Sequence, residues 1–196
     1  MSPDDRPVGF GRAVFLDRDG VLIEDVHHLT SVEQLRLLPH VPETLARLHR
    51  AGWGLIIATN QSVVARGLIT EERLREIHHA LESALRVRGA EIDAIYYCPH
   101  HPEGTLPAYR RVCECRKPNP GMLIRAADEW HLDLGASVIV GDAASDIEAG
   151  RRAGCRTVLI GASEAPARPG PPSAGDADYV AANLEDAARW IVAHFS

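Results

Sequence analysis

The chain has 196 residues, of which 45% are apolar and 24% are charged. That length predicts one domain, 1–196, and the composition argues against a disordered chain or a disulfide scaffold. Acidic residues outnumber basic ones by 27 to 21, and the resulting net charge of -6 argues against a protein that binds nucleic acid through a broad basic face.

The hydropathy and the cysteines indicate the compartment. No segment approaches the ~20 apolar residues that span a bilayer, and residues 1–7 are polar and acidic, unlike a signal peptide. Three of the four cysteines, Cys98, Cys113 and Cys115, lie close together in the sequence, which suits metal binding in a reducing environment. We therefore expect a cytoplasmic protein with no membrane partner, and we take a monomer as its default state.

Continuous apolar runs predict the strands. In chain order they are Ala13–Leu16, Leu55–Thr59, Ala94–Tyr97, Ser137–Val140 and Thr157–Ile160, with a short last strand at Tyr179. Runs of this length without polar alternation are typical of strands that are buried on both faces of a sheet.

Helical patterns separate these strands. The clearest begins after an N-cap at Thr70, carries an apolar stripe and ends near Gly89. Another begins with Pro120 as its first helical residue, and a closing helix starts from Asn183. The alternation predicts a three-layer, Rossmann-like α/β fold, in which a parallel sheet carries helices on both faces.

The segment before the last strand has a different composition. Residues 161–176 contain four Pro and three Gly and little that is able to pack, which predicts a mobile surface loop. The chain has no internal repeat.

Acidic residues follow two of the predicted strands. Parallel α/β sheets carry their chemistry at the carboxyl ends of the strands, where this chain has Asp17, Thr59, Cys98 and Asp142. Asp17 and Asp19 lie two residues apart, and burying two like charges is costly without a cation. Asp142 is expected beside them, and carboxylate oxygens favour Mg²⁺. In the alternative interpretation, Asp142 caps the helix at 143–153.

Candidate phosphate ligands follow the second strand and precede the helix at Pro120. Thr59, Asn60, Gln61 and Ser62 supply hydroxyl and amide donors suited to phosphate oxygens. Arg116 and Lys117 supply positive charge just before a helix N-terminus, which itself favours anions.

In this order, the motifs D-R-D-G, T-N-Q, R-K-P and G-D-x-x-x-D resemble those of the haloacid dehalogenase-like superfamily of phosphohydrolases, over residues 15–160. By that resemblance, Asp17 is the nucleophile that takes the phosphoryl group as an aspartyl-phosphate. Asp19 is then the general acid for the leaving oxygen, and later the base for the hydrolytic water. Thr59 and Lys117 fit the role of stabilising the charge on the transferred phosphoryl group.

The resemblance also implies the metal ligands. Mg²⁺ is expected on the side chains of Asp17 and Asp142 and on the backbone carbonyl of Asp19, with Asp146 orienting the site from behind these ligands. The metal is needed because a carboxylate and a phosphate dianion repel each other.

A cysteine and histidine cluster predicts a second metal. C-x-H at Cys98 and His100, followed by C-x-C at Cys113 and Cys115, provides the Cys₃His set of a closed tetrahedral zinc site in a loop at about 98–115. His101 is an alternative to His100, and the other interpretation is free thiols beside surface histidines. We expect structural zinc that fixes Lys117 on an otherwise loose loop, and a buried thiol at Cys155.

The segments Y-Y-C-P-H-H-P-E-G and C-E-C-R-K-P-N-P-G-M-L resemble one branch of the superfamily, the D-glycero-D-manno-heptose 1,7-bisphosphate 7-phosphatases. The resemblance implies removal of the 7-phosphate in nucleotide-activated heptose biosynthesis, with a small phosphorylated sugar as the partner. It places Asp25 to His28 in the substrate pocket, together with Thr59 to Ser62 and Arg116. Arg116 suits a distal phosphate, because guanidinium binds it as a bidentate fork; the alternative interpretation is an exposed loop arginine.

Three residues depart from the family pattern: Val63 replaces a usual Gly, His28 a usual aromatic residue, and Ala143 a longer polar side chain. They leave open the anomer and the exact sugar. The alternatives are a phosphatase for histidinol phosphate or for another small sugar phosphate or bisphosphate and, from another class, an inactive phospho-ligand sensor. Retention of both Asp17 and Asp19 argues against the sensor.

Overall fold

The computed structural model describes residues 11–161 and 177–195. Its strands form one sheet in the order β3-β2-β1-β4-β5-β6, and every neighbouring pair is parallel. The strands are β1 (Ala13–Leu16), β2 (Gly54–Asn60), β3 (Ala94–Cys98), β4 (Val138–Gly141), β5 (Arg156–Ile160) and β6 (Tyr179–Ala181). The predicted parallel α/β sheet is therefore confirmed; β1 has the predicted ends, and the other strands differ from the predicted runs by a residue or two.

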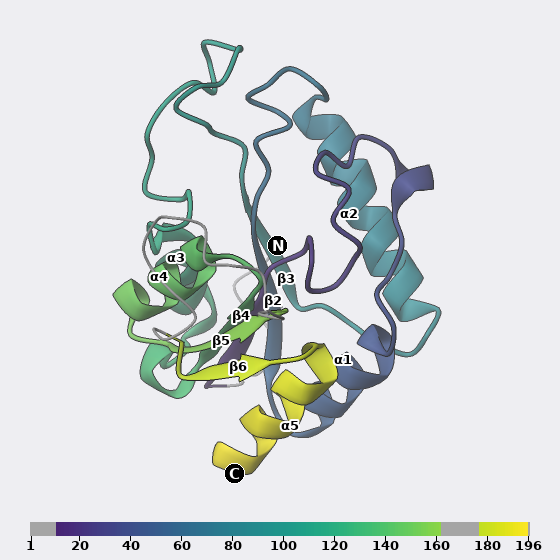
Figure 1. Cartoon of the computed structure of the whole chain (residues 1–196), viewed down its shortest axis with the longest axis vertical. Helices are drawn as coiled ribbons and strands as arrows, with labels where there is room; N and C mark the ends of the chain where they lie inside the picture. Colours follow the sequence, from purple (N-terminus) through teal and green to yellow (C-terminus); the bar gives the residue numbers. More distant parts are fainter. Residues whose placement is uncertain (1–10, 162–176, 196) are drawn as a thin grey trace.

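Helices cover both faces of the sheet. They are α1 (Val41–Arg50), α2 (Glu71–Arg86), α3 (Gly121–Trp130), α4 (Ala144–Ala153) and α5 (Leu184–His194), with short 3₁₀ turns at Val32–Gln34 and Leu134–Ala136. Figure 1 shows α1, α2 and α5 on one side of the sheet and α3 and α4 on the other. This is the three-layer arrangement that the alternating pattern predicts.

The two faces of β1 explain why its sequence is apolar throughout. Val14 and Leu16 pack into the cluster formed with α1, α2 and α5. Ala13 and Phe15 point the other way and pack with α3. Because successive side chains of a strand point to opposite faces, a central strand between two helical layers has no polar position.

The helices differ from the sequence analysis in three details. Helix α1 was not singled out, although Val41, Leu45 and Leu48 form its buried stripe. Helix α3 begins at Gly121, with Pro120 in the N-cap position. Asp142 does not cap α4: the N-cap is Ala143, whose N–H donates to Asp146 Oδ2 over 3.0 Å. The cap predicted at Thr70 is confirmed, since its side chain accepts a backbone N–H. The closing helix begins after Asn183, whose side chain also caps it.

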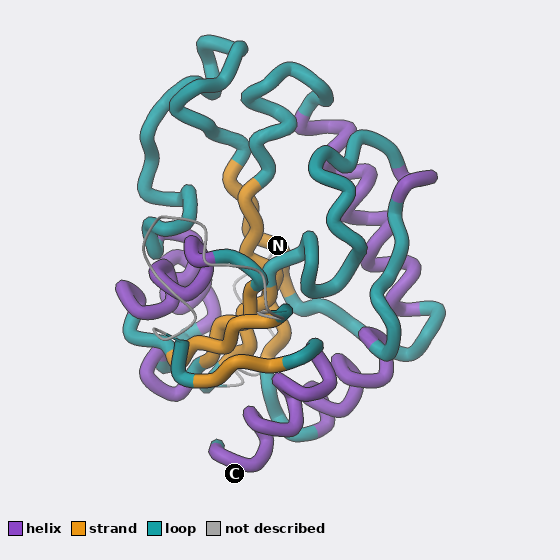
Figure 2. The backbone as a smooth tube through the Cα atoms, in the orientation of Figure 1, coloured by secondary structure: helices purple, strands orange, loops and turns teal. Residues whose placement is uncertain are grey.

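Loops at the carboxyl ends of the strands build the rest of the molecule. Figure 2 shows the loops that follow β2 and β3 running side by side beyond the sheet, and Leu106 N donates to Ala65 O between them over 3.0 Å. Within the described part of the chain, no helix is long and apolar enough to cross a membrane. The predicted loop at 161–176 lies, apart from Gly161, outside the described residues, as do residues 1–7. The single-domain boundary 1–196 stays a prediction.

Candidate active site

The ends of β1 and β4 bring the predicted acids together. These strands are neighbours, and Asp17 N donates to Val140 O over 2.9 Å. Carboxylate oxygens of Asp17, Asp142 and Asp146 lie within 4.8 Å of one another. Gly20 permits this approach: its φ is +74°, and a Cβ there would lie 2.1 Å from Asp142 Oδ2.

The acids form a site with excess negative charge. Burial, followed by the charges of Asp17 and Asp146, raises the pKa of Asp142 to about 7. A divalent cation would relieve that repulsion, and an all-oxygen donor set is the kind that Mg²⁺ takes. The residues present therefore fit the predicted magnesium ion.

Lys117 lies at the centre of this cluster. Its Nζ is 3.1 Å from Asp17 Oδ1 and 2.5 Å from Asp146 Oδ1, and it donates to Ala58 O over 2.6 Å. The side chain is buried, which alone would lower the pKa of the ammonium, but the carboxylates of Asp146 and Asp17 together raise it. Lys117 is therefore a buried cation held between two acids, one of them the predicted nucleophile.

Asn60 holds the backbone of Lys117 in place. Its Oδ1 accepts from Lys117 N and its Nδ2 donates to Lys117 O, both over 3.0 Å. The amide predicted to contact substrate is thus engaged with the backbone of the loop that carries Lys117.

The predicted general acid Asp19 has two neighbouring partners. Arg18 Nη2 donates to both of its carboxylate oxygens, over 2.9 and 2.8 Å. Gln61 Nε2 donates to Asp19 Oδ2 and to Thr59 Oγ1, each over 2.9 Å. Gln61 is buried, and its amide links Asp19 and Thr59, both of which are predicted catalytic residues.

The cysteine cluster has the spacing of metal ligands. The three sulfurs of Cys98, Cys113 and Cys115 lie 3.1–3.5 Å apart. His100 Nδ1 is 3.6 Å from Cys98 Sγ and 3.3 Å from Cys115 Sγ, and His101 is not part of the group. The hydrogen bond between Cys98 and Cys115 is the main cause that lowers the pKa of Cys115 to about 5, which favours a thiolate. This set fits tetrahedral zinc.

The cluster is tied to the loop that carries Lys117. Asn119 Nδ2 donates to Cys113 O over 2.9 Å, and Gly121 N donates to Glu114 O over 3.0 Å. A Cβ at Gly121 would lie 2.4 Å from that carbonyl, so only glycine allows the contact. Holding the cysteines together therefore holds the turn between them and α3.

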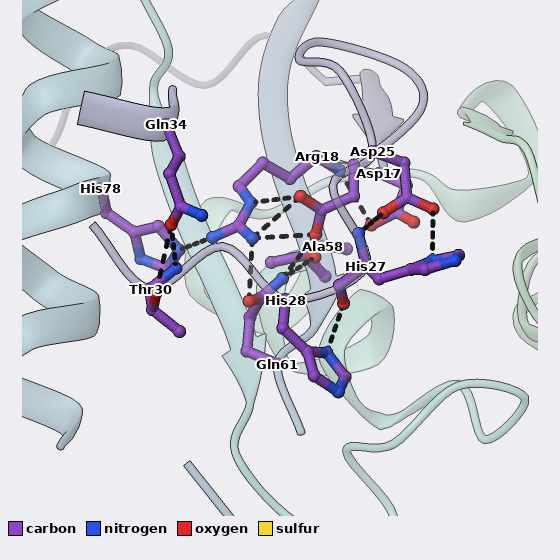
Figure 3. Close-up of polar contacts among 12 residues, drawn as sticks. Asp17, Arg18, Asp25, His27, His28, Thr30, Gln34, Ala58, Gln61 and His78 are labelled. Atoms are coloured by element: carbon purple, nitrogen blue, oxygen red, sulfur yellow. Dashed lines mark hydrogen bonds and ion pairs between the residues drawn. The ribbon is translucent and has the colours of Figure 1, made fainter. Parts of the chain in front are cut away.

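The other predicted substrate residues lie on loops that follow β1, β2 and β3. Asp25 and His28 are exposed on the loop after β1, where Asp25 Oδ1 accepts from His27 N over 2.7 Å; Figure 3 shows the three on one stretch of chain. Ser62 is partly exposed at the end of β2. Arg116 is also partly exposed, and its Nη1 donates to His100 O over 3.2 Å.

Sequence reasoning missed two residues of the site. Arg18 was passed over between the two acids, yet its side chain is 1% exposed and contacts Asp19. His78 on α2 is also buried and reaches Arg18. A charged residue directly after a buried strand was a usable signal for Arg18, whereas no spacing connects His78 with a residue 60 positions earlier.

Comparison with known proteins identifies relatives along most of the chain. A family model described as HAD-hydrolase-like matches residues 114–187. The D-glycero-beta-D-manno-heptose-1,7-bisphosphate 7-phosphatase of Rhodopseudomonas palustris is 46% identical over 142 residues, which cover 72% of this chain and 79% of the relative. The Escherichia coli K12 protein of the same name is 37% identical over 89% of this chain and 90% of its own length.

Solved structures agree in fold. D,D-heptose 1,7-bisphosphate phosphatase from B. bronchiseptica, in complex with magnesium and phosphate, superposes with a TM-score of 0.77 at 32% identity, covering 93% of this chain and 98% of that one. The enzyme of the same name from Burkholderia thailandensis has a TM-score of 0.63 at 26% identity, covering 92% and 98%.

Proposed function

The chain belongs to the D-glycero-D-manno-heptose-1,7-bisphosphate 7-phosphatase family of haloacid dehalogenase-like hydrolases, and we propose that it removes the 7-phosphate of a heptose 1,7-bisphosphate on the way to nucleotide-activated heptose. The observation that carries the proposal is the contact between Lys117 Nζ and Asp17 Oδ1 at 3.1 Å. It puts a buried cation beside a carboxylate that must approach an anionic phosphate.

The proposed reaction has two displacements on phosphorus. An Asp17 oxygen attacks the phosphoryl group, the bond from phosphorus to the sugar oxygen breaks, and Asp19 gives that oxygen a proton. A water, deprotonated by Asp19, then attacks the aspartyl-phosphate, which releases inorganic phosphate and regenerates Asp17. Lys117 and Thr59 balance the charge on the phosphoryl oxygens in both steps.

Magnesium is proposed on the side chains of Asp17 and Asp142 and on the carbonyl of Asp19. The ion supplies positive charge that lets two anions approach. The raised pKa of Asp142 supports this assignment, because burial and then the charges of Asp17 and Asp146 both disfavour its carboxylate when no cation is present. The Lys117 contact of Asp146 supports a role for Asp146 in holding Lys117.

Zinc is proposed on Cys98, His100, Cys113 and Cys115 with a structural role. These ligands form a closed set that leaves no position for substrate. The hydrogen bond from Asn119 to Cys113 supports a link from this site to the Lys117 turn. Bound zinc would therefore hold this loop in place, because a segment so short has too few apolar residues to form a core of its own.

Removing zinc should lower both stability and activity. A chelator that spares Mg²⁺ should reduce the melting temperature by about 5 °C or more, because the ligand loop loses its cross-link, and phosphate release should fall with it. Cys113→Ser should bind less zinc by elemental analysis and behave like the stripped protein. Cys155→Ala is the matched control, since that thiol is buried away from the cluster. Unchanged melting and activity after stripping would refute a structural zinc.

The substrate assignment rests on residues in the loops that follow β1, β2 and β3. Arg116 is proposed to bind the distal phosphate, with Asp25, His28 and Ser62 contacting the sugar. Partial exposure of Arg116 beside the zinc cluster supports this, because its guanidinium is accessible yet anchored to His100 O. Asn60 and Gln61 are proposed to act through Lys117 and Asp19 instead of by touching sugar.

A phosphate-release panel tests the function. The substrates are both anomers of heptose 1,7-bisphosphate, histidinol phosphate and fructose 1,6-bisphosphate, each with Mg²⁺. We expect kcat/KM to be highest for one heptose anomer, and Arg116→Ala to reduce the preference for bisphosphates by about tenfold or more. Comparable rates on all four substrates would contradict the heptose assignment. A preference for histidinol phosphate would show instead that the protein is a histidinol-phosphate phosphatase.

A further inference from the structure

A buried guanidinium lies behind the proposed general acid. Arg18 is 1% exposed, yet its side chain has acceptors on several sides. Nε and Nη2 donate to the Asp19 carboxylate, Nη2 donates to Gln61 Oε1 over 2.9 Å, and Nη1 lies 3.3 Å from His78 Nε2. Figure 3 shows the guanidinium between His78 and Gln61.

The contact with Arg18 determines the tautomer of His78. A guanidinium has only donors, so Nε2 of His78 must be the acceptor and the ring must be neutral with its proton on Nδ1. Burial, followed by the charge of Arg18, lowers the pKa of His78 to about 3, which agrees with a neutral ring. His78 is therefore a fixed acceptor for Arg18 throughout the working pH range.

His78 itself is held in place. It lies on α2 with 5% of its surface exposed, and its ring packs on Tyr97 with centroids 5.5 Å apart. Tyr97 in turn donates its hydroxyl to Glu71 Oε2 over 2.8 Å. Helix α2 and the edge strand β3 thus fix the imidazole, and the imidazole fixes one edge of the guanidinium.

We propose that His78 is a positioning residue for Asp19, acting through Arg18. Gln61 and His78 hold the guanidinium plane from two sides, and the guanidinium holds both oxygens of Asp19. The inference rests on the proposed function, because it assigns His78 to the step in which Asp19 protonates the leaving oxygen. Among the described residues, His78 contacts Arg18 and Tyr97.

Leaving-group dependence distinguishes positioning from a general structural role. A sugar alkoxide leaves only when it is protonated, whereas p-nitrophenolate is a stable anion that needs no acid. Because kcat/KM covers the steps up to the first irreversible one, a displaced Asp19 lowers it for the sugar phosphate and spares p-nitrophenyl phosphate. A generally damaged site would lower both.

The variants are His78→Phe, which keeps an aromatic ring on Tyr97 but removes the acceptor, and His78→Gln, whose Oε1 restores an acceptor at similar reach. We expect His78→Phe to lower kcat/KM for the best sugar phosphate by about 10- to 100-fold, and for p-nitrophenyl phosphate by less than about threefold. His78→Gln should recover most of the loss. The matched control is His79→Phe, because its side chain is 78% exposed on the same helix.

A double-variant cycle closes the test. In an Asp19→Asn background, His78→Phe should produce no further loss on the sugar phosphate, since the group that it positions is gone. Equal losses on both substrates, no rescue by His78→Gln, or additive effects with Asp19→Asn would each overturn the inference. Any alkyl phosphate in the panel serves as the poor leaving group, so a wrong heptose assignment leaves this test intact.

Discussion

Asp17→Asn should reduce kcat/KM for every substrate by about 10⁴-fold or more, because an amide cannot form the aspartyl-phosphate. The loss should be the same for sugar phosphates and for p-nitrophenyl phosphate, since both need the nucleophile. Acid-quenched reactions should show a phosphorylated chain by intact-mass spectrometry for the unchanged protein and none for the variant. The melting temperature should change little, because Lys117 keeps Asp146 as its partner.

Two further variants separate chemistry from metal binding. Asp142→Asn should lose activity mainly by weakening Mg²⁺ affinity, so added Mg²⁺ should restore part of it, whereas Asp17→Asn should not respond. Glu24→Gln is the matched control, because it makes the same acid-to-amide change at an exposed position of the loop after β1, which also carries Asp17. Phosphate release by Asp17→Asn within about tenfold of the unchanged protein would place the nucleophile elsewhere.

The strands were predictable because their apolar runs reflect burial on two faces. β1 is the clearest case, with the predicted Ala13–Leu16 identical to the observed strand. Helix α1 was overlooked because its apolar residues are interrupted by charged ones and it has no side-chain N-cap; His40 occupies that position with φ +61°. The spacing of Val41, Leu45 and Leu48, which places them on one face of a helix with 3.6 residues per turn, was the signal that would have predicted it.

The acids of the site were predictable from topology alone. Parallel neighbours end at one edge, so Asp17 and Asp142 had to meet once β1 and β4 were adjacent. The direction of side chains in the turns was not predictable. Gln61 and Asn60 read as substrate donors, yet their amides bond to Asp19, Thr59 and the backbone of Lys117. The C-x-H spacing, by contrast, favoured His100 over His101 in advance, and the structure groups His100 with the three cysteines.

Contacts between residues far apart in the chain were not predictable from the sequence. Arg18 and His78 meet only because α2 packs over the end of β1, and their separation of 60 positions follows no motif. Lys117 was predicted beside the phosphate, but its second partner Asp146 was expected only to orient the site. Such contacts depend on the three-dimensional path of loops, which local patterns do not encode.

Lys117→Met should lower kcat/KM by about 10³-fold and destabilise the fold by about 3–5 kcal/mol. Methionine matches the length of the lysine chain but leaves Asp146, which is 0% exposed, without its cation. Lys117 is the only lysine of the sequence. Nitrogen-labelled lysine therefore gives a single Nζ signal by NMR, and that signal should stay that of a charged ammonium to high pH in the unchanged protein, because Asp146 and Asp17 raise its pKa.

The destabilisation should depend on pH with a defined sign. In Lys117→Met, burial raises the pKa of Asp146 with no cation to oppose it, so the folded state binds more protons than the unfolded state. In the unchanged protein the pKa of Asp146 is already raised to about 6, mainly by burial, so stability relative to that protein should fall as the pH rises above about 6. Adding Asp146→Asn to Lys117→Met should flatten that dependence and recover stability, yet leave activity low, because the cation beside Asp17 is still missing. Recovery of activity in the double variant would mean that Lys117 only neutralises Asp146 and has no part in phosphoryl transfer.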